Sequence, residues 1–249
     1  GTEAILDPQQ ESQYLYSQGV EQYAQGHAKE ATESLTQALS IADGLELEPK
    51  ILWTLVSFHA QQEEFEQAAT YVTVLKPLLA KIQETWIQQE ASLPLLSLLM
   101  ETKLWNMAWT MSQYLPQDNN TLDPTVLARI HFEVARCLTT TSSTEQALPH
   151  LKEALELVQD RDEPRLKQAI LQNMVHAHAA EEEWDEALSF QESYMESIIR
   201  GGDDGEENPI ELAQGQYDAA QLYLAMEEYD DALSCLNAGL QLVPSKHGL

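Results

Sequence analysis

The sequence contains few cysteines and no long apolar run. Among its 249 residues, Cys137 and Cys235 lie far apart and lack the close spacing of a zinc or redox motif. Two distant thiols do not suggest a disulfide scaffold, so a reducing compartment fits best. No stretch approaches the roughly 18 uninterrupted apolar residues of a membrane helix. The N-terminal segment GTEAILDPQQ lacks the basic start and apolar core of an export signal. A cytoplasmic protein is expected.

Basic residues are also scarce. Lys and Arg number 13 against 41 Asp and Glu, and the formal net charge is −28. This excess argues against direct binding to nucleic acid or to an anionic membrane surface. Two readings of the charge stay open: an acidic surface that keeps the protein in solution, or a surface that attracts a basic partner. The chain starts without Met and stops at SKHGL, so we expect a fragment of a longer protein.

Motifs for catalysis are missing. The chain has no Gly-rich phosphate loop, no GxSxG and no HExxH. His176 and His178 stand two residues apart, and residues at that spacing point to different sides of a helix, so they are not a metal pair. His59 and His178 are instead predicted to be packed core histidines. The stretch GGDDGEEN (201–208) lacks the ligand spacing of a calcium loop and is interpreted as a connector. We therefore expect no enzyme activity, no metal and no cofactor.

What the sequence does contain is a repeated phrase. The stretch EEEWDEALSF (181–190) has near-copies in QEEFEQAATY from residue 62 and MEEYDDALSC from residue 226. Its alanine aligns with five others at intervals of 37, 40, 39, 40 and 45 residues, giving the anchor alanines Ala31, Ala68, Ala108, Ala147, Ala187 and Ala232. Regular spacing of this kind is typical of a repeat array.

Small and apolar residues follow each anchor alanine at fixed offsets. Twelve residues before it stand Gly19, Val56, Leu96, Ala135, Val175 and Ala220, and an aromatic stands three before it in four repeats. Each repeat is therefore predicted to be two helices joined by a turn, and one hairpin cannot bury its own apolar face. The pairs Asp7-Pro8, Asp123-Pro124 and Asn208-Pro209 are predicted helix starts, each with a capping side chain before a proline.

The stretch YLYSQGVEQYAQGHAKEATESLTQAL (14–39) resembles a tetratricopeptide repeat (TPR). Leu15, Gly19, Tyr23, Gly26 and Ala31 stand where that family's signature places large, small, aromatic, Gly and Ala residues, and Pro244 matches its closing proline. The period resembles a long, about 40-residue variant of the family. The resemblance implies an all-α fold, a right-handed α-α superhelix of about six hairpins in one domain over 1–249. The expected repeats are 12–45, 49–82, 89–120, 124–160, 164–200 and 208–244. The third is irregular between Pro77 and Pro94, and in the fourth TTTSSTEQA replaces the aromatic turn.

In the TPR family, the first helix of each repeat lines the concave side and holds extended peptides. Carried over, the positions fifteen before each anchor alanine are Tyr16, Trp53, Leu93, Phe132, Gln172 and Tyr217. The positions eleven before it are Val20, Ser57, Ser97, Arg136, His176 and Gln221. Aromatic rings above polar residues favour a peptide groove. The alternative is that the rings pack against a neighbouring helix. The acidic turns are expected to form a ridge beside the groove that steers a basic partner.

The resemblance and the absence of catalytic motifs predict a non-enzymatic adaptor that binds a protein segment in this groove. Two alternatives stay open: a regulatory or sensing module that controls an attached output domain, and an acidic, chaperone-like binder of a basic client. The sixth repeat ends near Leu242 without a full capping helix, so self-association through that end is also expected.

Overall fold

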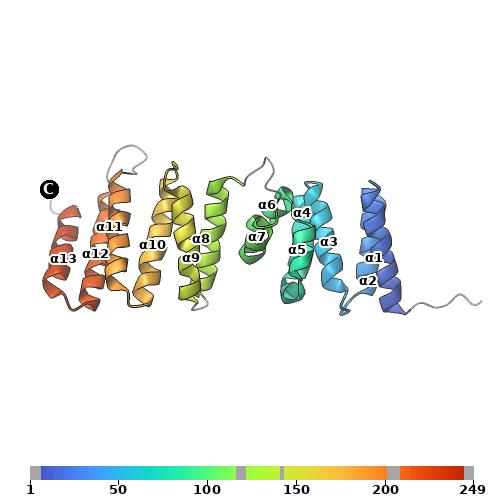
Figure 1. Cartoon of the computed structure of the whole chain (residues 1–249), viewed down its shortest axis with the longest axis horizontal. Coiled ribbons are helices and arrows are strands. Elements are labelled where there is room, and N and C mark those ends of the chain that lie inside the picture. Colours follow the sequence, from blue (N-terminus) through green and yellow to red (C-terminus); the bar gives the residue numbers. More distant parts are fainter. Residues whose placement is uncertain (1–6, 116–121, 141–142, 201–207, 244–249) are drawn as a thin grey trace, which may run out of the picture. The chain divides into compact units, whose positions relative to one another are not determined.

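The computed structural model describes residues 7–115, 122–140, 143–200 and 208–243. In this part of the chain all regular structure is helical (Figure 1), which confirms the predicted all-α helical solenoid. The chain divides into two compact units, Gly1–Asn120 and Thr121–Leu249. Most of the predicted connector at 201–208, the closing Pro244 and residues 141–142 of the fourth turn lie outside the described residues.

The first unit contains two regular hairpins and an irregular third. The regular hairpins are α1 (Pro8–Ala24) with α2 (Ala28–Ile41), and α3 (Glu48–Gln61) with α4 (Phe65–Leu75). They are followed by the 3-10 helix η1 (Lys76–Lys81), α5 (Glu84–Gln89), α6 (Leu93–Glu101) and α7 (Trp105–Ser112). Pro77 and Pro94 each lie in the first turn of their element, where the missing N–H of proline costs nothing.

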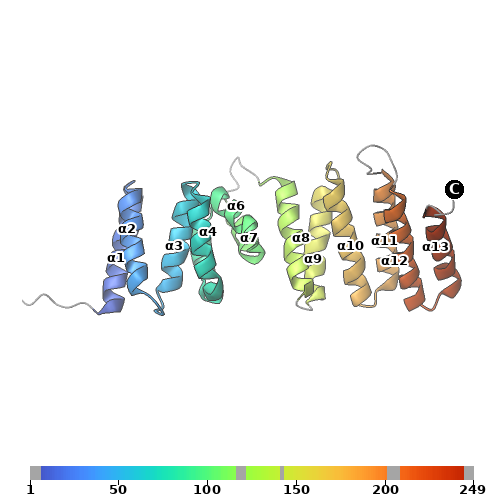
Figure 2. The same ribbon diagram turned by 180° about the vertical axis from the view of Figure 1, so that it is seen from behind.

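The second unit contains three regular hairpins. They pair α8 (Pro124–Thr140) with α9 (Thr144–Val158), α10 (Pro164–Ala180) with α11 (Trp184–Arg200), and α12 (Pro209–Ala225) with α13 (Tyr229–Leu242). Figures 1 and 2 show these six helices standing side by side within the unit. The second helix of one hairpin contacts the first helix of the next, so α9 packs on α10 and α11 on α12.

The predicted helix starts are confirmed. The Asp7 carboxylate accepts a hydrogen bond from the Gln10 N–H at 2.8 Å, and the Asp123 carboxylate accepts one from the Thr125 N–H at 2.8 Å. The Asn208 side-chain oxygen accepts from the N–H groups of Ile210 and Glu211. Each cap satisfies amide groups that have no partner inside the first helical turn.

The anchor alanines lie where the two helices of each hairpin meet. All six are at most 1% exposed, and the six residues twelve positions before them are buried as well. Gly19 shows why small residues are needed: a Cβ at this position would lie 2.7 Å from Cγ of Leu35 and 3.1 Å from the Ala31 carbonyl oxygen. The repeated small residues therefore set how closely the helix axes approach.

Every hairpin turn closes through the same main-chain bond. The N–H four residues before the anchor alanine donates to the carbonyl nine before it at 2.8–3.0 Å, in the pairs His27–Gln22, Glu64–His59, Leu104–Leu99, Ser143–Leu138, Glu183–His178 and Glu228–Tyr223. Five residues before the anchor, φ is positive at Gly26, Glu63, Lys103, Glu182 and Glu227. This is the left-handed turn that ends many helices. The repeated acidic phrase therefore marks an exposed, recurrent helix stop.

Candidate partner-binding face

Within each unit, the face made by the first helices of its hairpins is called here the first-helix face. Several side chains predicted to line it are exposed: Val20 at 37%, Leu93 at 41% and Tyr217 at 50%. Four polar members, Ser97, Arg136, His176 and Gln221, are exposed too, and Gln172 is half-buried. These side chains are accessible to a partner.

Three predicted members of the groove are buried. Trp53 is 1% exposed and its indole Nε1–H donates to the Trp86 carbonyl at 3.2 Å. Phe132 belongs to the core of the fourth hairpin, and the Ser57 hydroxyl donates to the Trp53 carbonyl at 3.0 Å. For Trp53 and Phe132 the alternative that the rings pack against neighbouring helices holds, and Ser57 is buried beside Trp53. Their contribution is to hold the face in shape.

An aromatic cluster lies on the first-helix face of the first unit. It consists of Tyr16 on α1, Lys50 on α3 and Trp86 on α5. The Lys50 Nζ lies 5.3 Å from the Tyr16 ring centre and 5.7 Å from the Trp86 ring centre, so two rings attract one ammonium group. The Tyr16 hydroxyl is 3.4 Å from the Thr54 hydroxyl, and burial raises the pKa of Tyr16. The cluster offers apolar rings and a cation in one place.

A chain of hydrogen bonds continues beside this cluster. The Tyr23 hydroxyl donates to Oε1 of Gln61 at 3.0 Å, and Nε2 of Gln61 donates to Oε2 of Glu90 at 3.5 Å. Burial raises the pKa of the Glu90 carboxyl, while the bond from Gln61 acts in the opposite direction. The first-helix face of the first unit thus carries both a positive group, Lys50, and a carboxyl group whose pKa is raised, Glu90.

Lys50, Trp86 and Glu90 were not predicted from the sequence to line the first-helix face. The prolines at 77 and 94 broke the repeat pattern, so α5 was not expected to add to the first-helix face. The spacing of Trp86 and Glu90 by four residues was the available signal, since residues at that spacing share one side of a helix.

On the second unit the face is more polar. The Arg136 guanidinium lies 5.8 Å from the centre of the Phe132 ring and 2.8 Å from the Glu133 carboxylate. Glu133 also pairs with Arg129 at 3.1 Å, so one buried carboxylate fixes two arginines along α8. The ring of Tyr217 on α12 adds an exposed aromatic group to this side.

The predicted metal and histidine features can be compared with the structure. Among the described residues, no group of three or more His, Cys, Asp or Glu side chains lies together to hold a metal ion. His178 is buried and bonded to Glu183, whereas His176 is exposed, so the two histidines do point to different sides. His59 and His178 are packed core histidines, as predicted. No described helix has both the length and the apolar character to cross a membrane.

The turn carboxylates are exposed. Glu181, Glu182 and Glu183 follow α10, and Glu227 and Glu228 follow α12. Figure 1 shows that these two turns lie at the same end of the second unit. That end is called here the acidic end. The acidic end carries five exposed glutamates in the turns of two successive hairpins, so the electrostatic potential there is negative.

The stacked hairpins define a helical-repeat protein, and buried small residues recur in each of them. No family model and no curated protein sequence matches the chain. Among solved structures, BtubC (BKLC) from P. vanneervenii has a TM-score of 0.50 and 15% identity over 98% of this chain and 94% of that chain. This likeness shows the shared helical-repeat fold.

Two further solved structures are similar over most of the chain. YrrB, described as a TPR protein with an unusual peptide-binding site, has a TM-score of 0.41 and 16% identity over 85% of this chain and 93% of its own. PilF from Pseudomonas aeruginosa has a TM-score of 0.39 and 19% identity, covering 97% of this chain and 95% of that chain.

Proposed function

We propose that the protein is a non-enzymatic interaction module that binds a segment of another protein on its first-helix face. The observation that carries this proposal is the aromatic cluster of Tyr16, Lys50 and Trp86. Rings supply apolar contact at small entropic cost, and the ammonium and the nearby Glu90 carboxyl supply hydrogen bonds to a main chain. The low cysteine content of the sequence, with two cysteines far apart at positions 137 and 235, supports placement in the reducing cytoplasm.

Site-specific photocrosslinking tests the proposal. Benzoylphenylalanine at position 16 or 217 is expected to crosslink a partner protein in cells. The matched control is position 14, because Tyr14 is 63% exposed and points to a different side of α1 from Tyr16. Equal crosslinking from positions 14 and 16 would contradict binding on the first-helix face.

Truncation separates recognition from packing. Tyr217→Ala removes a half-exposed ring and is expected to lower partner affinity about tenfold while changing the free energy of unfolding by less than about 0.5 kcal/mol. Trp53→Ala removes a buried side chain and is expected to cost about 3 to 5 kcal/mol of stability. A Tyr217 variant with lost stability and unchanged binding would overturn the role given to Tyr217.

A second candidate function rests on the acidic end. Its exposed carboxylates favour attraction of a basic client, and such attraction weakens as salt shortens the Debye length from about 10 Å at 0.1 M to about 3 Å at 1 M. Glu181→Gln together with Glu227→Gln is expected to slow association with a basic client at low salt. An association rate that does not depend on salt would argue for the first-helix face alone.

Self-association through the last hairpin is also proposed. The outer side of α13 exposes Tyr229 at 65%, Leu233 at 58% and Leu240 at 72%. In repeat arrays such a side is normally covered. Leu233→Ser with Leu240→Ser is expected to convert a concentration-dependent dimer to a monomer in light scattering. A wild-type mass that stays monomeric at high concentration would contradict this proposal.

A further inference from the structure

Two pockets on the second-helix side of the second unit occupy equivalent places in successive repeats. The first outer groove lies between α9 and α11 above α10 and has a volume of about 690 Å³. The second outer groove lies between α11 and α13 above α12, with about 590 Å³. Counted from the anchor alanines, the equivalent lining pairs are Leu155 and Met195, Gln159 and Ile199, Lys167 and Leu212, Leu171 and Gln216, Ser193 and Ala238, and Ser197 and Leu242.

The same geometry carries different chemistry in the two grooves. The second outer groove is mainly apolar, with Leu212, Ile199 and Leu242 among its lining and with two glutamates. In the first outer groove, Lys167 takes the place of Leu212, and Gln159 takes the place of Ile199. The scaffold does not require a cation at this position, because the next repeat folds with leucine there.

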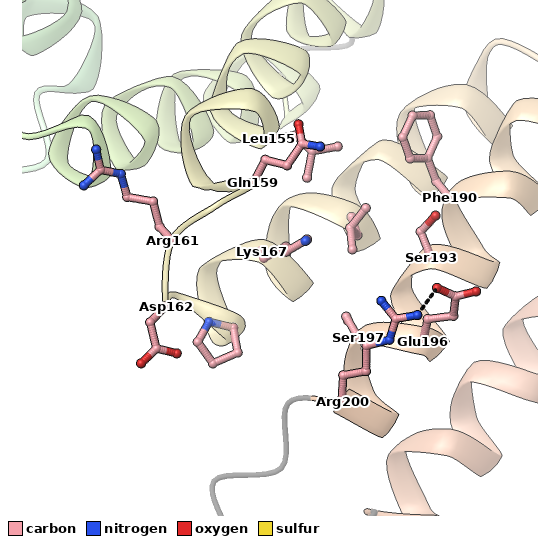
Figure 3. Close-up of a pocket in the computed structure, with 12 residues that line it drawn as sticks. Leu155, Gln159, Arg161, Asp162, Lys167, Phe190, Ser193, Glu196, Ser197 and Arg200 are labelled. Atoms are coloured by element: carbon pink, nitrogen blue, oxygen red, sulfur yellow. Dashed lines mark ion pairs between the residues drawn. The ribbon is translucent and has the colours of Figure 1, made fainter.

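Cations are concentrated in the first outer groove. Arg161, Lys167 and Arg200 line it, three of the chain's 13 Lys and Arg, against the carboxylates of Asp162 and Glu196. In Figure 3, the Lys167 side chain reaches from α10 toward α11 and the Arg200 side chain lies beside Glu196. A locally positive pocket is unexpected in a protein with a net charge of −28.

The charges of this pocket are largely uncommitted. Among the described residues, neither Lys167 nor Arg161 forms an ion pair. Arg200 approaches Glu196 at 3.6 Å, but the two side chains are 81% and 66% exposed, and such surface pairs contribute little. The guanidinium can therefore turn to an anionic ligand at small cost.

The rest of the lining defines what accompanies the anion. Leu155, Leu171 and Phe190 provide apolar surface in the pocket. The hydroxyl of Ser197 donates to the carbonyl of Tyr194, and that of Ser193 to the carbonyl of Ser189. Each hydroxyl oxygen keeps its acceptor capacity and is able to receive an N–H from a main chain.

We propose that the first outer groove binds an acidic peptide segment in which a carboxylate lies next to an apolar side chain. The carboxylate binds between Lys167 and Arg200, and the apolar side chain rests on Phe190 and Leu171. An inorganic anion would leave this apolar surface in water, so a peptide is favoured over phosphate. Remote acids of the protein oppose the ligand weakly, because the Debye length is about 8 Å at physiological ionic strength.

The test uses the whole chain and a defined probe. ¹H–¹⁵N spectra are recorded during titration with the acetylated, amidated peptide EEFEE and, separately, with QQFQQ. Chemical-shift changes are expected at the amides of Lys167, Ser193 and Ser197 with EEFEE, with about tenfold weaker binding of QQFQQ. Equal affinities for the two peptides, or shifts confined to the first-helix face, would overturn the proposal. Stronger competition by inorganic phosphate than by QQFQQ would show an anion site without peptide recognition and would also overturn it.

A matched pair of variants separates a site from net charge. Lys167→Glu is expected to weaken EEFEE binding about tenfold or more, whereas Lys152→Glu, an equal charge change at an exposed α9 position outside the pocket, is expected to change it less than about twofold. Lys167→Leu installs the residue of the next repeat, so it is expected to keep the helical signal and thermal midpoint while losing the peptide. Equal losses for the 152 and 167 variants would contradict a local site.

Discussion

Nδ1 of His178 lies 2.6 Å from Oε2 of Glu183, and the N–H of Glu183 donates to the His178 carbonyl at 2.9 Å. The side chains of these two residues therefore repeat the bond that their main chains make. The same arrangement joins His59 and Glu64, three repeats earlier, again at 2.6 Å. Each histidine ring also stacks on an aromatic ring of the second helix, Phe190 or Tyr71. The pair ties the end of the first helix to the start of the second.

Removing the charge from this pair tests its contribution. Glu183→Gln is expected to lower the free energy of unfolding by about 1 kcal/mol, because a bond to a charged acceptor is replaced by a neutral one. The control is Glu182→Gln in the same turn, for which no side-chain bond is present in the described structure, with an expected change below about 0.5 kcal/mol. Urea unfolding followed by circular dichroism measures both. Equal losses would assign the effect to the charge of the turn.

The left-handed turn residues give a second prediction. Glu182 has φ of 60°, a region that costs residues with a Cβ about 1 kcal/mol relative to glycine. Glu182→Gly is expected to raise the unfolding free energy by about 0.5 to 1 kcal/mol. Gly26→Ala is expected to lower it by a similar amount, purely through backbone conformation, since a Cβ there meets nothing within 4 Å. If thermal unfolding showed Glu182→Gly to be destabilising or Gly26→Ala to be stabilising, the turns would not be held in this conformation.

Two buried helical glycines are expected to respond differently to a methyl group. At Gly19, a Cβ meets Cγ of Leu35 at 2.7 Å and a main-chain oxygen at 3.1 Å, so overpacking outweighs the gain in helix propensity and costs about 1 to 2 kcal/mol. At Gly215, the nearest atoms belong to the flexible Met195 side chain, so alanine is expected to be neutral or stabilising. Thermal midpoints of the two variants check the order. A destabilised Gly215→Ala equal to Gly19→Ala would contradict it.

A histidine pair in the fourth hairpin predicts a pH dependence. The Nδ1 atoms of His131 and His150 lie 3.0 Å apart, and burial, followed by the charge of His150, lowers the pKa of His131 to about 4. Between pH 6.5 and about 4 the unfolded chain binds a proton at residue 131 that the folded chain does not. Stability from this site is therefore complete above pH 6.5 and falls as the pH decreases.

Unfolding measurements at pH 7.5 and pH 5 test this dependence. Between pH 7.5 and pH 5, protonation at His131 is expected to lower the free energy of unfolding of the wild-type chain by about 1 to 2 kcal/mol. The His131→Gln variant lacks this contribution, so its free energy of unfolding is expected to fall by about 1 to 2 kcal/mol less than that of the wild type. A variant whose loss on acidification equals that of the wild type would exclude His131 as the source.

The periodic features of the fold could be predicted from the sequence because they obey short-range rules. Two kinds of local requirement produce these features. The anchor alanines and the residues twelve before them allow close contact between two helices, and the capping pairs satisfy the amide groups at a helix start. The turn at Gly26 was recognisable because glycine favours a positive φ. At Glu63, Lys103, Glu182 and Glu227 the conformation is imposed by the closing bonds, and residue type gave no sign of it.

The candidate site was less predictable because exposure depends on neighbouring hairpins. Trp53 and Tyr217 hold equivalent positions, yet one is 1% exposed and the other 50% exposed. On one side of Trp53 lies α5, whose Trp86 carbonyl accepts a hydrogen bond from the Trp53 indole. Lys167 was not singled out either. Its significance emerges only when its place in a groove is set beside that of Leu212 one repeat later.

The six turn bonds involve main-chain atoms alone, so the same closing bond forms with different side chains around it, and the His–Glu pairs reinforce it in only two of the six described turns. Individual grooves can therefore differ while the turn bonds stay the same, as Lys167 and its equivalent Leu212 illustrate. Repeats with the same backbone arrangement can therefore carry different binding sites.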